Sequence, residues 1–182
     1  IKVMVDTSPC NPFTSWYHPK SFGLAIDFDL GLDPEMMQCQ LAQFFEWKSG
    51  KLDEDYSEFD KKYEWLPVYK YEHSGVAYNT GGFSCPWDSG LVGIVYVAKD
   101  DEEVCNTEEF LKGQVELLSQ YANGEVYGYI AVGIDEEGNE DDSVFEDSCW
   151  GFYGSESVMG AVDECKKYID TYVNPDNFKL EA

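Results

Sequence analysis

The chain has 182 residues, which is enough for one ordinary domain or two small ones. It contains 36 Asp and Glu but only 12 Lys and no Arg, so its formal net charge is −24. This charge excludes nucleic-acid binding through a basic surface and argues against binding to anionic membranes. The content of 43% hydrophobic residues argues against disorder, and no apolar run is long enough for a transmembrane helix.

The first third of the chain predicts two strands and one helix. Residues 2–6 are typical of a short strand, and residues 22–30 alternate between apolar and acidic side chains, as in a half-buried strand. Asp33 and Pro34 predict a helix start, and Gly50 predicts its end. Residues 51–63 are highly charged and indicate a solvated connection or a short exposed helix.

The central third predicts a hairpin, a buried strand and a second helix. Residues 66–71 and 76–79 are strands joined by a turn, and residues 81–90 form a loop rich in Gly and Ser. Residues 91–98 are continuously apolar, which favours a fully buried strand. Asn106 stands three residues before Glu109, a capping-box pattern that predicts a helix start.

The last third predicts a second hairpin and a final helix. Residues 125–134 and 143–153 are strands, and the loop of residues 135–142 between them has no apolar residue. Ser155 begins a helix with one apolar face, which Asn174 and Pro175 end.

Strands joined mainly by hairpins, together with separate helices, indicate the α+β class. We expect a single α+β domain with a mainly antiparallel sheet and about three helices on one face. Within it we distinguish a variable N-terminal part (1–65), a core (66–154) and a C-terminal helix (155–174). Because the sequence begins with Ile1 rather than Met, we expect a trimmed or processed start.

Five strings in residues 66–154 resemble a family of bacteriophage and mobile-element proteins. They are LPVYKYEHSG (66–75), FSCPWDSG (83–90), G-x-x-YV (93–97), GEVYGY (124–129) and DSCWGFYG (147–154). The resemblance covers about half of the chain, whereas the N-terminal third departs from the family's pattern. It implies a phage-type setting and a location in the host cytoplasm, but no biochemical mechanism.

The six cysteines are Cys10, Cys39, Cys85, Cys105, Cys149 and Cys165. An even number is compatible with disulfides, but a chain of this length does not need them. The cysteines lie in or beside apolar runs, so we interpret them as free thiols packed in the core of a protein from a reducing compartment. No C-x-x-C pair supports a zinc site.

Cys85, His73 and Asp88 are the residue types of a thiol enzyme. A thiolate nucleophile needs a base and an orienting carboxylate, and a Gly-rich loop can offer N–H groups to an oxyanion. The alternative is a structural loop in which Trp87 fills the core and Gly90 takes a positive φ. We favour this alternative and expect no catalytic residue and no enzyme activity.

Eight carboxylates and no Lys occur in residues 135–147, which makes this segment a candidate metal site. Calcium loops of the EF-hand type need Gly at the sixth position and a carboxylate at the first. Counting back from Gly138 places Gly133 at the first position, so the pattern fails. Weak divalent-cation binding and a solvated hairpin tip remain as alternatives, and we expect no metal and no cofactor.

The charge itself suggests a function. On average, 24 negative charges equal the phosphate charge on roughly 40 Å of duplex DNA. We therefore expect an acidic accessory protein that mimics DNA and inhibits a basic host protein, such as a nucleic-acid-binding or defence protein. Plain acidity or adaptation to high salt, a cysteine-dependent hydrolase, and an aromatic-rich structural or carbohydrate-contacting module are the alternatives.

The expected partner-binding residues are unpaired carboxylates in two acidic segments and two tryptophans in segments interpreted as loops. They are Asp100, Asp101, Glu102, Glu103, Asp135, Glu136, Glu137, Glu140, Asp141, Asp142, Trp16 and Trp65.

Overall fold

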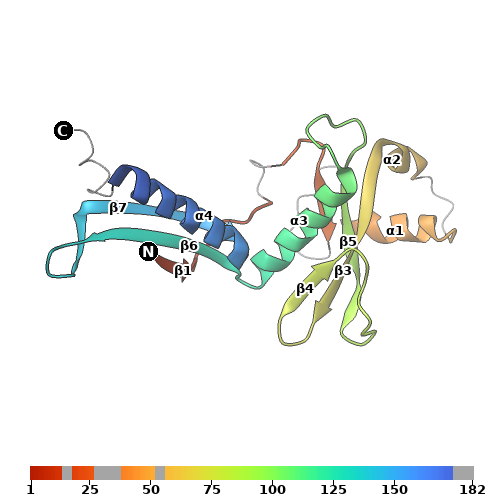
Figure 1. Ribbon diagram of the computed structural model, residues 1–182. Helices are drawn as coiled ribbons and strands as arrows, with labels where there is room; N and C mark the ends of the chain where they lie inside the picture. Colours follow the sequence, from red (N-terminus) through yellow and green to blue (C-terminus); the bar gives the residue numbers. More distant parts are fainter. Residues whose placement is uncertain (14–17, 27–37, 52–55, 174–182) are drawn as a thin grey trace. The chain divides into compact units, whose positions relative to one another are not determined.

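The computed structural model describes residues 1–13, 18–26, 38–51 and 56–173 (Figure 1). The contacts between residues divide the chain into two compact units. The terminal unit comprises Ile1–Cys10 and Gly124–Ala182, and the central unit comprises Asn11–Asn123. The two units differ in their sheets, since each has its own set of antiparallel strands.

The central unit has four strands and three helices among its described residues. In chain order they are β2 (Gly23–Ile26), α1 (Gln38–Lys48), α2 (Ser57–Lys62), β3 (Tyr63–Glu72), β4 (Val76–Asn79), β5 (Ser89–Ala98) and α3 (Thr107–Ala122). The strands form one sheet in the order β2-β5-β3-β4. All three neighbouring pairs are antiparallel.

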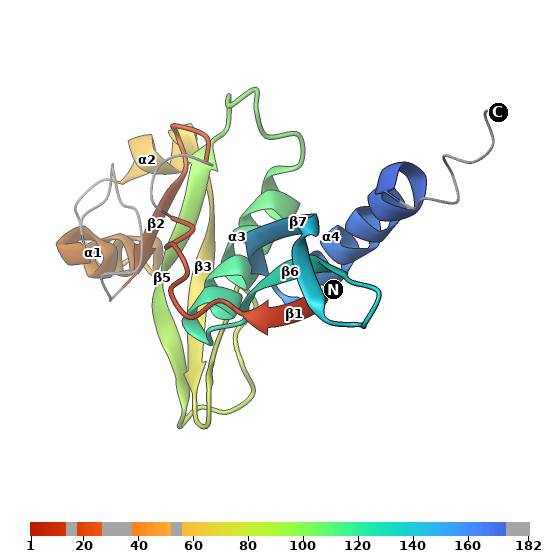
Figure 2. The ribbon, with the colours of Figure 1, turned by 90° about the vertical axis from the view of Figure 1, so that its left-hand side faces the viewer.

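Strand β5 shows why helices cover both faces of this sheet (Figure 2). Its side chains alternate between the faces, as in any strand. Val95 and Val97 belong to a buried cluster with the apolar side of α3. Ile94 and Tyr96 belong to a second cluster with Phe44 of α1, against which residues of α2 also pack. A strand that is apolar on both faces needs a layer of helices on each.

Helix α3 follows its sequence signals closely. The Asn106 side chain accepts a hydrogen bond from the Glu109 N–H, and the Asn106 amide donates to the Glu109 carboxylate at 2.8 Å. Asn106 is therefore the predicted N-cap, but the Glu109 carboxylate accepts from its side-chain amide rather than from its backbone N–H, as it would in a capping box. The buried residues Leu111, Val115 and Leu118 are spaced by four and three positions, so one apolar side of the helix faces the sheet.

Among its described residues, the terminal unit has three strands and one α-helix. They are β1 (Lys2–Val5), β6 (Val126–Ile134), β7 (Glu140–Tyr153) and α4 (Ser155–Tyr168), which continues into a π-helical turn, η1 (Ile169–Val173). The antiparallel sheet has the order β1-β6-β7. Val162 and Cys165 of α4 pack against Tyr129 and Ala131 of β6.

The predicted α+β class is confirmed, and the strands are antiparallel as expected. The strands fall into two sheets, however, and the helices of the central unit cover both faces of its sheet rather than one. Contacts divide the chain at residues 10/11 and 123/124, whereas the sequence analysis placed segment boundaries at 65/66 and 154/155.

Individual elements begin and end close to their predicted positions. Strand β4 has the predicted bounds, and α4 begins at Ser155 as predicted. Only residues 23–26 of the strand predicted over 22–30 are described as strand, and the helix start predicted at Asp33 lies outside the described residues. Every helix in the described ranges is too short or too polar to cross a membrane.

Candidate functional site

The loop between β4 and β5 contains the FSCPWDSG string and is tied to the sheet by several hydrogen bonds. The Asn79 side chain accepts from the Gly82 N–H at 2.7 Å and donates to the Gly82 carbonyl at 3.0 Å. Gly82 has a φ of 81°, a conformation that favours glycine. Farther along, the Ser89 hydroxyl donates to the Cys85 carbonyl, and the Glu72 N–H donates to the Asp88 carbonyl at 2.9 Å. The loop is therefore held in one conformation.

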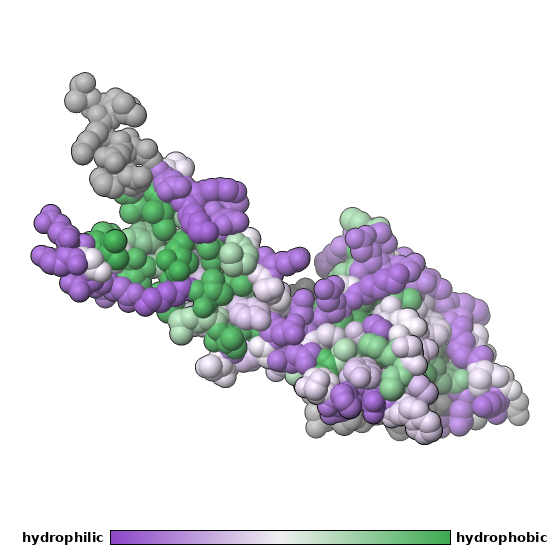
Figure 3. All heavy atoms as spheres, turned by 60° about the horizontal axis from the view of Figure 1, so that its bottom comes forward, coloured by the Kyte–Doolittle hydropathy of each residue, from purple (hydrophilic) through white to green (hydrophobic). Residues whose placement is uncertain are grey.

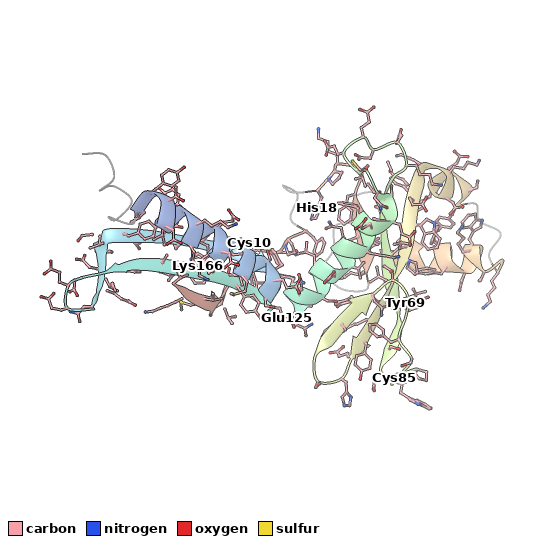
Figure 4. The ribbon with its side chains drawn as sticks, in the orientation of Figure 1. Cys10, His18, Tyr69, Cys85, Glu125 and Lys166 are labelled. Carbon is pink, nitrogen blue, oxygen red and sulfur yellow. The ribbon has the colours of Figure 1, made fainter. Side chains whose placement is uncertain are left out.

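Cys85 lies in this loop (Figure 4), and the other two candidate catalytic side chains lie close by. The Cys85 Sγ lies 3.5 Å from Asp88 Oδ2, and His73 Nδ1 lies 3.7 Å from the same oxygen. His73 belongs to the turn between β3 and β4. The structure thus brings together the three residue types that the thiol-enzyme alternative requires.

The order of the three groups does not match a thiol nucleophile. In such a site the base contacts the thiol, and the carboxylate orients the base from its far side. Here the same carboxylate oxygen of Asp88 lies near both the Cys85 thiol and the His73 imidazole. The group beside the thiol is thus a carboxylate, which differs from the thiol–base contact of such a site.

Trp87 differs from the sequence-based expectation. The prediction that it fills the core is wrong, because 91% of this side chain is exposed. It lines a concave surface of about 360 Å³ on the sheet of the central unit, together with Lys70, Glu72, Asp88, Ser89, Gly90 and Val92. Gly90, which the structural-loop interpretation assigned a positive φ, is not among the positive-φ glycines.

The acidic segment after β5 is only partly free for binding. Asp101 is half-buried: its carboxylate accepts hydrogen bonds from the Ser21 hydroxyl and, at 3.0 Å, from the Glu103 N–H. Asp100, Glu102 and Glu103 are exposed. Three of the four predicted partner-binding carboxylates in this segment therefore face solvent, and the fourth stabilises the loop.

The acidic loop between β6 and β7 is a tight turn whose carboxylates have different roles. The Asn139 amide and backbone donate to Asp135 and lower the pKa of its carboxyl group. Hydrogen bonds from Ser143 do the same for Asp141, while Glu140 forms an ion pair with Lys2.

The other three carboxylates of this loop are exposed. They are Glu136, Glu137 and Asp142.

Trp65 packs at the edge of the core. The prediction that it is an exposed anchor for a partner is therefore wrong. It lies in β3, with its ring 5.0 Å from the Phe44 ring, and its indole N–H donates to Asp60 at 2.9 Å. Lys48 Nζ lies 2.7 Å from the same Asp60 oxygen and 5.3 Å from the centre of the Trp65 ring. These hydrogen bonds from Lys48 and Trp65 lower the pKa of Asp60. Trp16 lies outside the described residues.

Sequence reasoning missed a second cluster of titratable groups, on the helix side of the terminal sheet. The Tyr129 hydroxyl donates to Asp147 at 2.8 Å, and the Cys165 thiol lies 3.6 Å from the same carboxylate oxygen. Burial, followed by the interaction with Asp147, raises the pKa of both Tyr129 and Cys165. Both groups therefore stay protonated at neutral pH, and the cluster acts as a polar network within the core.

The five described cysteines are free thiols, but their expected burial is wrong for most of them. Cys165 is buried, whereas Cys10, Cys105 and Cys149 are exposed and Cys85 is intermediate. Cys39 lies among the residues whose side chains are not described. Within the described part of the chain, no three His, Cys, Asp or Glu side chains are arranged to hold a metal ion.

Exposed apolar side chains gather on the terminal unit (Figure 3). Ile1, Val3 and Val5 of β1 are 46%, 43% and 55% exposed. A concavity of about 580 Å³ lies between this strand and α4, lined mainly by apolar side chains, including Met159. It offers few polar groups that could orient a ligand.

The net negative charge is divided equally between the units. The terminal unit has 16 of the 36 acidic residues and 4 of the 12 lysines, and the central unit has the other 20 and 8, so each has a net charge of −12. Lysines form ion pairs with carboxylates in both units, for example Lys2 with Glu140 and Lys112 with Glu108. With 12 lysines in all, at least 24 carboxylates have no lysine to balance them.

No protein-family model, curated protein or solved structure matches this chain.

Proposed function

We propose that the protein binds a basic, nucleic-acid-binding partner by presenting exposed carboxylates where that partner accepts phosphates. The observation that supports the proposal is the surplus of at least 24 unbalanced carboxylates, several of them in two exposed loops. The sequence resemblance suggests a phage-type setting, in which the partner is a host protein, for example a defence protein, in the host cytoplasm.

Because the chain has two units, the charge of each unit is considered separately. A net charge of −12 equals the phosphate charge on about 20 Å of duplex DNA, which is the length that a small DNA-binding module covers. Each unit therefore has enough charge to compete for such a module by itself. The proposal requires no continuous row of carboxylates across both units.

Catalysis by Cys85 is not part of the proposal. The carboxylate of Asp88, rather than the imidazole of His73, is the group that contacts the thiol. This differs from the thiol–base contact of a cysteine-dependent enzyme.

The test begins with capture of a host protein at low and at high salt, followed by competition with duplex DNA. We expect the captured protein to release the acidic protein when duplex DNA is added, because both occupy its basic surface. A captured protein that binds DNA and the acidic protein simultaneously would contradict mimicry.

A charge-matched pair of variants then locates the surface. In the first variant, the exposed residues Glu102, Glu103, Glu136 and Glu137 are changed to Gln. Each exposed contact contributes under about 1 kcal/mol, but four together weaken binding by about tenfold or more and flatten its dependence on salt.

The control variant changes four ion-paired residues instead: Glu58→Gln, Glu108→Gln, Asp163→Asn and Glu164→Gln. Its net charge is the same, so it separates local contacts from the overall field. Equal losses of affinity in both variants would refute the assignment of binding to the two loops.

A further inference from the structure

Trp87 lies at the surface, on a loop whose backbone is held by hydrogen bonds. A tryptophan side chain normally gains stability by burying its large apolar surface, yet 91% of this one is exposed. The residues on both sides of it are fixed, because the Cys85 carbonyl accepts from Ser89 and the Asp88 carbonyl accepts from the Glu72 N–H at 2.9 Å. The backbone that presents the ring is thus preorganised for contact with a ligand.

The concavity beside the ring has one excess negative charge. Its lining includes Lys70, Glu72 and Asp88. Lys70 and Glu72 form an ion pair and balance each other. The carboxylate of Asp88 is the remaining charge in the lining, and its side chain is 39% exposed. An anionic ligand is therefore disfavoured here, and a cationic one is favoured.

The same unit already holds a cation between an indole ring and a carboxylate. Lys48 lies 5.3 Å from the Trp65 ring centre and 2.7 Å from Asp60, and this Asp60 carboxylate accepts a hydrogen bond from the Trp65 indole. At the loop, Trp87 and Asp88 present the same two groups to solvent from adjacent positions.

We propose that Trp87 and Asp88 form a binding site for an arginine side chain of the basic partner. A guanidinium group stacks on an indole face and at the same time donates two parallel hydrogen bonds to a carboxylate. The chain has no Arg of its own, so no internal group of this kind competes for the site. This inference rests on the proposed function, since it names the chemical group that the partner contributes.

The test uses small ligands, so it does not depend on knowing the partner. The indole N–H signals of the five tryptophans are followed by two-dimensional NMR, and Trp87→Phe identifies the Trp87 signal. The titration uses N-acetyl-arginine amide at about pH 8, in a buffer without competing guanidinium or ammonium ions. The matched ligand is N-acetyl-citrulline amide, which has nearly the same shape and no charge.

We expect arginine amide to shift the Trp87 signal in a saturable manner and citrulline amide to leave it in place. Asp88→Asn should weaken arginine binding by about fivefold or more, because it removes the charge-assisted pair. Trp150→Phe, which changes another partly exposed tryptophan, should leave the binding unaffected. Thermal melting of each variant verifies that it is folded.

Equal shifts with arginine and citrulline would overturn the proposal, as would a shift with methyl glucoside in the absence of one with arginine. The latter result would assign the concavity to a neutral sugar. These outcomes are independent of the capture experiment. If arginine binds at Trp87 but duplex DNA fails to compete for the captured protein, mimicry is refuted while the arginine site stands.

Discussion

Gly93 is the position at which adding one methyl group should do most damage to the central unit. It lies in β5 opposite Ile26 of β2. A Cβ atom placed on Gly93 would lie 2.1 Å from the Ala25 carbonyl oxygen and 2.8 Å from the Ile26 Cα, both of which are backbone atoms. Ordinary contact begins near 3.4 Å, so the two strands would have to separate by about 1.3 Å.

Such a separation has a cost that can be estimated. Overpacking a close-packed interior costs about 1–3 kcal/mol. Strands that move apart by more than 1 Å also lose one or two backbone hydrogen bonds, each contributing about 0.5–1.5 kcal/mol. We therefore expect Gly93→Ala to lower the free energy of unfolding of the central unit by about 2–4 kcal/mol.

Gly90 provides the control, because it lies in the same strand and a Cβ there would have no atom within 4 Å. Gly90→Ala should be neutral or stabilise by about 0.4–1 kcal/mol, since alanine reduces the freedom of the unfolded chain. The assay is urea unfolding followed by tryptophan fluorescence, which reports mainly on the central unit because four of the five tryptophans belong to it. Similar unfolding midpoints for the two variants would refute the packing argument.

Three further predictions concern pH, thiol reactivity and salt. Burial between Phe13 and Phe22 lowers the pKa of His18. Below about pH 6.5 the unfolded chain therefore binds more protons than the folded chain, and the free energy of unfolding falls as the pH decreases. His18→Phe should remove this loss between about pH 6.5 and 5, whereas changing the exposed His73 to Gln should not; equal slopes in both variants would contradict the explanation. A thiol reagent at neutral pH should label Cys149 well before Cys165, which is buried and has a raised pKa; peptide mapping that finds Cys165 first would show that the core opens readily. Finally, the melting temperature should rise between about 0.01 and 0.3 M NaCl, because salt screens the repulsion among unbalanced carboxylates, and a flat curve would argue against such repulsion.

Local patterns in the sequence were sufficient to locate most elements. The N-cap at Asn106 depends only on residues within one helical turn, and the period-two or continuous apolar runs identify the strands directly. Composition alone determined the net charge of −24 and the absence of Arg, and these two facts remain the basis of the proposed function.

Which side chains are buried was decided by segments distant in the sequence. Trp65 and Trp87 are both tryptophans near polar residues, and the sequence analysis assigned each of them to the wrong environment. Trp65 packs against Phe44, which α1 supplies from about twenty residues away, whereas no part of the described chain covers Trp87. Burial depends on this long-range packing, and no local pattern encodes it.

The geometry of the candidate sites was likewise a tertiary result. The sequence identified Cys85, His73 and Asp88 only as residue types that suit a thiol enzyme, and their closeness came from the fold. The pairing of β3 with β4 and β5 decided that one carboxylate oxygen of Asp88 would lie near both of the other side chains. The same pairing places Lys70 and Glu72 beside Trp87, since side-chain neighbours across a sheet depend on strand pairing rather than on sequence distance.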